Sequence, residues 1–128
     1  VGAFHDLIMK RLPQRFPGLR WAFVEISASW VPYAMNDLML RFRRQNRDWP
    51  GDELLKENDI YVACQTADDL PYVLSCAGDD NIVIGTDYGH ADTATEISAL
   101  RNLRDGGQVS ESAAEKILCH NPKRLYGL

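Results

Sequence analysis

The sequence has no long hydrophobic run and no excess of positive charge. A membrane-spanning helix needs about 20 consecutive apolar residues, and no apolar run here approaches that length. The 14 lysine and arginine residues are outnumbered by 18 aspartate and glutamate residues, which gives a formal net charge of −4. Because no basic field is present to hold a polyanion, we expect no nucleic-acid partner and no binding to anionic membranes.

Cysteine is also scarce. Cys64, Cys76 and Cys119 are odd in number and widely spaced, and the sequence has no Cys-x-x-Cys pair. This usage is typical of a reducing compartment in which thiols serve as small apolar side chains, so we expect a cytoplasmic protein. We also expect no signal peptide, because polar residues such as His5 and Lys10 interrupt the start of the sequence.

The common catalytic motifs are missing as well. The sequence has no phosphate-binding loop, no Gly-x-Gly-x-x-Gly, no Gly-x-Ser-x-Gly, and neither His-x-His nor His-Glu-x-x-His. No motif of this kind therefore identifies the chemistry.

The patterns that are present alternate between helix and strand. Helices are expected over 4–16, 31–44 and 70–78, and two more follow capping boxes at 93–96 and 112–115. Strands are expected over 19–26, 60–66 and 81–84, where the side chains are mainly aromatic, aliphatic or β-branched. This alternation is typical of right-handed βαβ units and predicts an α/β fold with a parallel sheet, either open or part of a barrel.

The size and composition fit a single domain. The chain has 128 residues, of which 45% are hydrophobic, so we expect one globular domain over 1–128. The segment 44–58 departs from the alternating pattern because its composition becomes polar around Asp48-Trp49-Pro50-Gly51-Asp52. We interpret this segment as a surface excursion.

Polar side chains stand where each expected strand ends: Glu25 after the first, Gln65 and Thr66 after the second, and Asp87 after the third. The C-terminal ends of parallel strands point in one direction, so these side chains can converge on one site. Asp87 is the clearest candidate, because a buried apolar run passes through Gly85 and delivers an acid directly after it. A simple capping or turn-forming role explains the spacing of Asp87 equally well.

Three further residues are candidates for the functional site because of their positions in the sequence. Glu25 has the parity of Trp21 and Phe23 along the first strand, so we expect it on a buried face, where a carboxylate needs a partner or a metal ion. A paired structural acid is the alternative for Glu25. Trp30 follows the first strand and can line a pocket or shield the end of the sheet, whereas His90 follows the third strand and is either functional or simply exposed.

Four segments occur in a recognisable order: Arg15-Phe16-Pro17-Gly18-Leu19-Arg20, Val31-Pro32-Tyr33, Ile84-Gly85-Thr86-Asp87-Tyr88 and Lys116-Ile117-Leu118-Cys119-His120-Asn121-Pro122-Lys123-Arg124-Leu125-Tyr126-Gly127-Leu128. Together they resemble the amidohydrolase-related family, in the branch that includes aminocarboxymuconate-semialdehyde decarboxylase and related metal-dependent hydrolases. The resemblance covers nearly the whole chain.

The resemblance implies a (β/α)8 TIM barrel with a divalent metal, most often zinc, at the C-terminal ends of its strands. Asp87 matches the last-strand aspartate of the family, which is a metal ligand and proton-transfer group. Glu25 stands seven residues before Pro32, where many members carry a histidine. The first-strand His-x-His pair and the middle-strand histidine of the family have no counterpart here, so the chain resembles the last three or so βα units, the C-terminal part of such a barrel.

Taken together, these expectations predict that the protein is a metal-dependent hydrolase or decarboxylase (a lyase) that acts on a small carboxylate-bearing or cyclic substrate. Asp87 would be metal ligand and proton shuttle, Glu25 an accessory acid, and Tyr88, His90 and Trp30 would line the mouth of the pocket. The rivals are a non-catalytic α/β barrel fragment or binding module without metal, and a metal-free acid–base enzyme built on Glu25 and Asp87. Many members of the family pair into dimers, so a homodimer is compatible with the resemblance.

Overall fold

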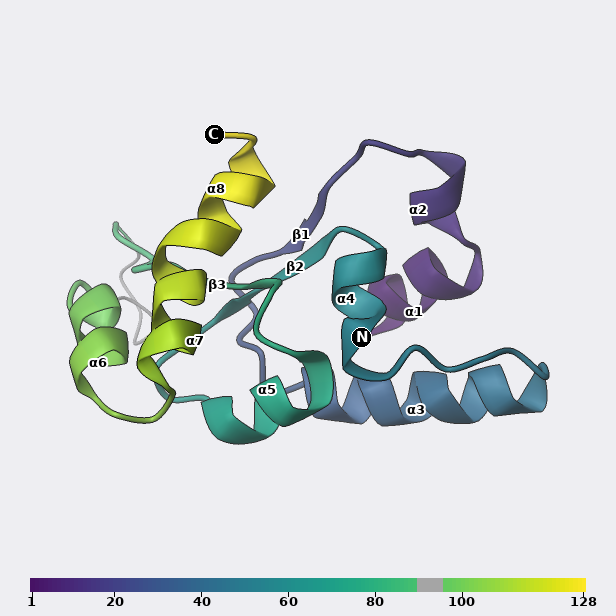
Figure 1. Cartoon of the computed structure of the whole chain (residues 1–128), viewed down its shortest axis with the longest axis horizontal. Coiled ribbons are helices and arrows are strands. Elements are labelled where there is room, and N and C mark those ends of the chain that lie inside the picture. The colour runs from purple at the N-terminus through teal and green to yellow at the C-terminus, as the bar shows by residue number, and fades with distance from the viewer. Residues whose placement is uncertain (90–95) are drawn as a thin grey trace.

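The computed structural model describes residues 1–89 and 96–128, and its centre is a small parallel sheet (Figure 1). The strands β1 (Trp21–Phe23), β2 (Ile60–Cys64) and β3 (Ile82–Ile84) lie in the order β1-β2-β3. Phe23 is aligned with Val62, and Cys64 is aligned with Ile84. Both strand pairs are parallel, and helices connect the strands in sequence, as parallel neighbours require. The expected α/β class with parallel strands is therefore confirmed.

Helices precede, connect and follow these strands. They are α1 (Gly2–Met9), α2 (Leu12–Arg15), α3 (Val31–Arg44), the 3₁₀-helix η1 (Gly51–Glu53), α4 (Leu54–Glu57), α5 (Leu70–Ala77), α6 (Ala99–Asp105), α7 (Glu111–Glu115), the π-helical turn η2 (Lys116–His120) and α8 (Asn121–Tyr126). In Figure 1, α3 and α5 pack side by side, and α7, η2 and α8 form one column that ends at the C-terminus. None of the described helices combines the length and apolar character needed to cross a membrane.

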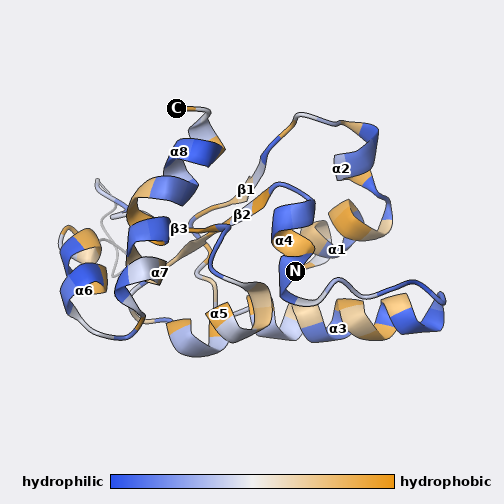
Figure 2. Cartoon of the chain, in the orientation of Figure 1, coloured by the Kyte–Doolittle hydropathy of each residue, from blue (hydrophilic) through white to orange (hydrophobic). Residues whose placement is uncertain are grey.

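One face of the sheet carries the hydrophobic core. Ile60, Val62 and Ile82 are fully buried on this face and belong to one cluster with side chains of α1, α3 and α5. Figure 2 shows that α3 alternates hydrophobic and hydrophilic residues along its length, as expected for a helix that packs with one side only. The opposite face of the sheet is less completely covered: Ala22 of β1 is exposed, and the next residue of the same parity, Val24, is 58% exposed.

The column of α7, η2 and α8 is fixed to the sheet by a buried amide. Asn121 is fully buried, and its Nδ2 donates hydrogen bonds to the backbone oxygens of Asp79 (2.7 Å) and Ile82 (2.6 Å). Lys116 adds ion pairs to Asp79 (2.6 Å) and Asp80 (2.9 Å). These contacts hold the C-terminal helices against the start of β3.

Asp80 is the centre of this ion-pair cluster and should make stability depend on pH. Hydrogen bonds from Lys116 and Lys56 lower the pKa of Asp80 to about 2. Because the unfolded value is about 3.9, the stabilisation is fully present above that pH and is lost as the pH falls towards 2. We expect Asp80→Asn to lower the free energy of unfolding at pH 7 by about 1.5 kcal/mol, allowing for partial solvent exposure.

Urea denaturation of both proteins between pH 7 and pH 2.5 measures this effect, and the difference should shrink at the acidic end. Asp6→Asn is the matched control, because Asp6 forms an exposed pair with Lys10 (2.9 Å) that contributes little. An equal loss in both variants, or a difference that does not depend on pH, would contradict the assignment.

Several element boundaries differ from the sequence-based expectation. The first strand is limited to Trp21–Phe23, because Glu25 has a left-handed φ of 66° that ends the extended backbone. The helix expected over 4–16 is interrupted at Arg11, which also has a left-handed φ, of 52°. In 44–58, where we expected a surface excursion, η1 and α4 form, and Leu54 (1% exposed) and Leu55 (0%) join the core. The polar residues around these two leucines made the segment look exposed in the sequence, although the leucines pack into the core.

Two capping predictions also change. The helix expected after the box at 93–96 begins at Ala99, and Ile97 before it is 71% exposed; residues 93–95 lie outside the described residues. The last helices are capped by Ser110, whose Oγ accepts a hydrogen bond from the Ala113 backbone N–H at 3.1 Å, and not by Ser112. Ser112 instead lies within α7.

Candidate active site

The C-terminal ends of the three strands meet at one cavity. It has a volume of about 220 Å³, and three strand-end polar residues, Glu25, Gln65 and Asp87, line it together. Its apolar wall combines Val24, Ala63 and Val83 from the open side of the sheet with Leu125 and Tyr126 from α8. The structure therefore brings together most of the polar side chains that the strand ends were expected to deliver.

The two acids of this cavity share an unusual backbone conformation. Glu25 has a φ of 66° and Asp87 a φ of 47°, and both follow their strands within three residues. Left-handed φ is uncommon for residues other than glycine, asparagine and aspartate, and it occurs often where a functional side chain must be aimed out of a regular element. Gly85 lies close to this carboxylate, since an added Cβ there would be in ordinary van der Waals contact with Asp87 Oδ1, at 4.0 Å.

Glu25 differs from the prediction in its burial. We placed it on the face of Trp21 and Phe23, but the structure exposes it. The strand ends before Glu25, so the alternation of side chains no longer applies to it. The expected burial of Glu25 is therefore wrong, whereas its expected place at the strand ends agrees with its position in the cavity lining.

Of the three expected pocket-mouth residues, the two that the structure describes, Trp30 and Tyr88, do not line the cavity with these acids. Trp30 packs edge-on against Phe4 and Phe23, with ring centroids 5.2 Å and 5.6 Å away, and its indole N–H donates to the backbone oxygen of Ser27 at 2.9 Å. Tyr88 is 82% exposed. His90 lies outside the described residues. Trp30 thus supports the loop after β1 from within an aromatic cluster.

Asp68 organises the loops at this end of the sheet. It is 5% exposed, and its carboxylate accepts hydrogen bonds from the backbone N–H groups of Ala28 (2.9 Å) and Gln65 (2.8 Å) and from the hydroxyls of Ser27 and Ser29. The loop after β1 is thereby tied to the loop after β2. The next helix, α5, is capped by the neighbouring Asp69, which accepts from the Tyr72 N–H at 3.2 Å.

The surroundings of Asp68 fix the protonation of two groups. Burial acts to raise the pKa of Asp68, but hydrogen bonds from Gln65, Ser27, Ser29 and Ala28 outweigh it and hold the pKa below its ordinary value. Burial, with the nearby Asp68 charge, raises the pKa of the Cys64 thiol to about 12. Cys64 therefore remains a neutral thiol at physiological pH and is no nucleophile for this site.

Thr66 is taken up by a second network. Its hydroxyl hydrogen-bonds Glu96 Oε2, the Glu96 backbone N–H donates to the Thr86 oxygen at 2.9 Å, and Asn102 Nδ2 donates to Glu96 Oε1 at 2.6 Å. This network links the ends of β2 and β3 to α6. This role of Glu96 was not predicted from the sequence, in which we interpreted Glu96 as the last residue of a capping box.

The family model described as amidohydrolase matches residues 1–128. The chain belongs to the amidohydrolase family. Among solved structures, it is similar to an amidohydrolase from Mycobacterium avium subsp. paratuberculosis K-10, with a TM-score of 0.75 and 27% sequence identity. No curated protein matches the chain.

The match to the mycobacterial amidohydrolase covers 94% of this chain but 31% of that protein. The chain thus spans less than one third of the length of a protein with the same local fold. That protein is an amidohydrolase, and the structural match to it agrees with the parallel βα units of this chain.

Members of the amidohydrolase superfamily generally use divalent metals, so the residues of this cavity can be tested as ligands. Within 1–89 and 96–128, no group of three or more His, Cys, Asp or Glu side chains is placed to hold a metal ion. Asp87 and Glu25 are carboxylates of the type that divalent cations accept, but two carboxylates do not fill the four positions of a zinc site. The described residues alone therefore do not make a complete metal site.

Proposed function

We propose that this chain is the C-terminal part of an amidohydrolase-family (β/α)8 barrel, and that Asp87 is the central residue of its active site. The reaction would be the hydrolysis or decarboxylation of a small carboxylate-bearing or cyclic substrate. The observation that carries the proposal is the convergence of Glu25, Gln65 and Asp87 on one cavity at the C-terminal ends of parallel strands. Catalytic residues of TIM-barrel enzymes occupy this end of the strands.

The incompletely covered face of the sheet supports the barrel. Parallel sheets are normally buried on both faces, yet Ala22 and Val24 are exposed on the side of the cavity, and β1 and β3 are edge strands among the described residues. In a closed barrel this face would point inward and be filled by side chains of further strands, and neither edge would remain open. The chain would then contribute the last three strand–helix units, with β3 as the final strand.

In the proposed reaction Asp87 moves the proton. For hydrolysis of a C–N bond, its carboxylate accepts a proton from the attacking water and returns it to the leaving nitrogen as the bond breaks. For decarboxylation, the protonated carboxyl of Asp87 would deliver its proton to the carbon that loses carbon dioxide, and solvent would then protonate Asp87 again. Glu25, across the cavity, would act as the accessory acid that orients the substrate or shares the proton.

A divalent metal, with zinc as the first candidate, would supply electrostatic stabilisation of developing negative charge and acidify a bound water when it occupies this site. Asp87 would be one of its ligands, and the remaining ligands would come from outside the described residues. Tyr88 and His90 follow Asp87 directly and remain proposed contacts at the mouth of the pocket, whereas Trp30 is proposed to act through the Ser27 loop that it supports. The decarboxylase-like branch is the finer assignment favoured by the resemblance of the four sequence segments taken together.

The proposal extends to partners and location. A small-molecule substrate is the expected partner, with no nucleic acid and no membrane, in line with the net charge of −4. A cytoplasmic location and a homodimer are proposed with it.

Metal analysis of the intact protein tests this function. We expect at least one divalent ion per protomer by inductively coupled plasma mass spectrometry, and we expect turnover of small carboxylic acids or cyclic amides to stop on chelation and return on addition of zinc. Turnover that persists after complete removal of metal would favour acid–base chemistry by Glu25 and Asp87 alone. Absence of both metal and turnover would favour a binding module.

A further inference from the structure

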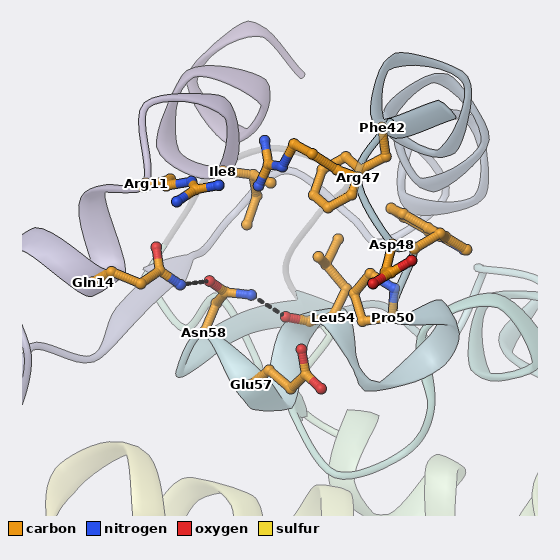
Figure 3. A pocket seen from close by; sticks show the side chains of 11 residues that line it. Ile8, Arg11, Gln14, Phe42, Arg47, Asp48, Pro50, Leu54, Glu57 and Asn58 are labelled. Atoms are coloured by element: carbon orange, nitrogen blue, oxygen red, sulfur yellow. Dashed lines mark hydrogen bonds between the residues drawn. The ribbon is translucent and has the colours of Figure 1, made fainter. Parts of the chain in front are cut away.

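A larger cavity lies at the opposite end of the sheet. It has a volume of about 450 Å³ and is formed where α1, α2, the end of α3 and α4 meet (Figure 3). Asn58 lines it and precedes the first residue of β2, Ile60, by two positions, whereas Gln65 of the candidate active site follows the last residue of β2. This cavity is thus separate from the proposed catalytic site, and its size suits a small molecule.

The walls of the cavity are held in place by packing and by paired polar groups. Ile8, Phe42 and Leu54 belong to the hydrophobic core, and Trp49 packs edge-on against Phe42 with ring centroids 5.4 Å apart. Asn58 is 8% exposed, and its side chain accepts a hydrogen bond from Gln14 and donates one to the Leu54 oxygen, both at 2.8 Å. The cavity is therefore preformed, with an apolar floor.

Two arginines reach into one side of it, as Figure 3 shows. The Arg47 guanidinium carbon lies 4.0 Å from the centroid of the Phe42 ring, and its side-chain hydrogen bond to Gln45 is long, at 3.4 Å. Arg11 forms no side-chain hydrogen bond or ion pair with another residue of 1–89 or 96–128. Stacking on an aromatic ring leaves the edge of a guanidinium able to bind a carboxylate with two parallel hydrogen bonds.

Two carboxylates complete the lining. Glu57 lies on the side of the cavity away from the arginines, and Asp48 lies at the right-hand rim of the view (Figure 3). Neither forms an ion pair with a described side chain. We propose that this cavity binds a small zwitterion with an apolar middle, whose carboxylate meets Arg11 and Arg47 and whose ammonium group meets Glu57. A ligand with one charge would make only one of these two contacts.

The rigid zwitterion 4-(aminomethyl)benzoate is a suitable probe, with 4-methylbenzoate and 4-methylbenzylamine as analogues that lack one charge each. In isothermal titration calorimetry with the intact protein, we expect the zwitterion to bind at least about tenfold more tightly than either analogue. Equal affinity of 4-methylbenzoate would overturn the zwitterion assignment, and so would the absence of binding by all three compounds.

Arg11 offers a variant that separates binding from folding. Because its φ is 52°, Arg11→Gly relieves the backbone while it removes the guanidinium, so the unfolding midpoint should stay the same or rise. We expect this variant to bind the zwitterion and 4-methylbenzoate about tenfold more weakly, with no change for 4-methylbenzylamine. Arg15→Gln, an exposed arginine on α2 outside the cavity, is the control for charge alone. Unchanged affinity in Arg11→Gly would overturn the proposal.

Discussion

Replacing Asp68 with alanine is expected to lower the free energy of unfolding of the intact protein by about 3 kcal/mol. The carboxylate is 5% exposed and accepts from four donors, on Ser27, Ala28, Ser29 and Gln65. Alanine would leave these donors without their acceptor in a place that water reaches poorly, and the cost of such groups exceeds the value of the hydrogen bonds themselves. Urea denaturation measures the global effect.

Hydrogen exchange gives the local readout that a general loss of packing would not produce. In Asp68→Ala the backbone N–H groups of Ala28 and Gln65 should lose protection more than those of the β2 core, because each donates to Asp68. Asp69→Ala is the matched control: it removes the neighbouring acid, whose bond to the Tyr72 N–H caps α5, and should cost about 1 kcal/mol with no change at Ala28. Equal effects of the two variants would show that Asp68 does not tie the loops together.

The fold class was predictable because its signals are local. The 3.6-residue spacing of apolar residues in α3 indicates one buried side, and the residues with this spacing are all buried: Val31, Ala34, Met35, Leu38 and Phe42. The apolar, β-branched runs at β2 and β3 identified two strands. Alternation of these elements restricts the topology strongly, so the parallel order and the meeting of the strand ends followed from the sequence.

The details of the site depend on backbone turns and long-range contacts that no local pattern encodes. The alternation of side chains between the two faces of a strand holds only while the chain is extended. The residues of β1 do not indicate that the backbone turns to a left-handed φ at Glu25, which exposes its side chain. Ser27 and Asp68 are 41 residues apart in sequence, so their hydrogen bond could not be inferred from spacing. The sequence gives only a qualitative indication of these hydrogen bonds, namely two serines in the loop after one strand and an acid in the loop after the next.

The cavity between α1 and α4 was missed for a related reason. The segment 44–58 looks polar as a whole, but Leu54 and Leu55 turn inward, and its charged residues surround an apolar floor. Average composition over a segment conceals such a two-sided arrangement. A short amphipathic turn contains too few residues to produce a periodic signal.

Asp87→Asn should reduce kcat/KM of the intact enzyme by about 10³-fold and lower its content of bound metal, while the free energy of unfolding changes by less than about 1 kcal/mol. Asparagine is the informative substitution because it matches aspartate in shape and also accepts a left-handed φ, which is 47° at this position. The loss would therefore reflect the carboxylate, which an amide replaces neither as an anionic ligand nor as a group that exchanges protons at neutral pH.

Two further variants serve as the comparison and the control for Asp87→Asn. Glu25→Gln should have a smaller effect, about tenfold, because Glu25 is proposed as the accessory acid of the same cavity. Asp69→Asn makes the same chemical change at an exposed helix cap that asparagine also serves, so activity and metal content should remain at the level of the unmodified protein. If Asp87→Asn kept full activity and full metal content, Asp87 would be neither ligand nor proton shuttle. Its left-handed conformation would then serve only the turn after β3.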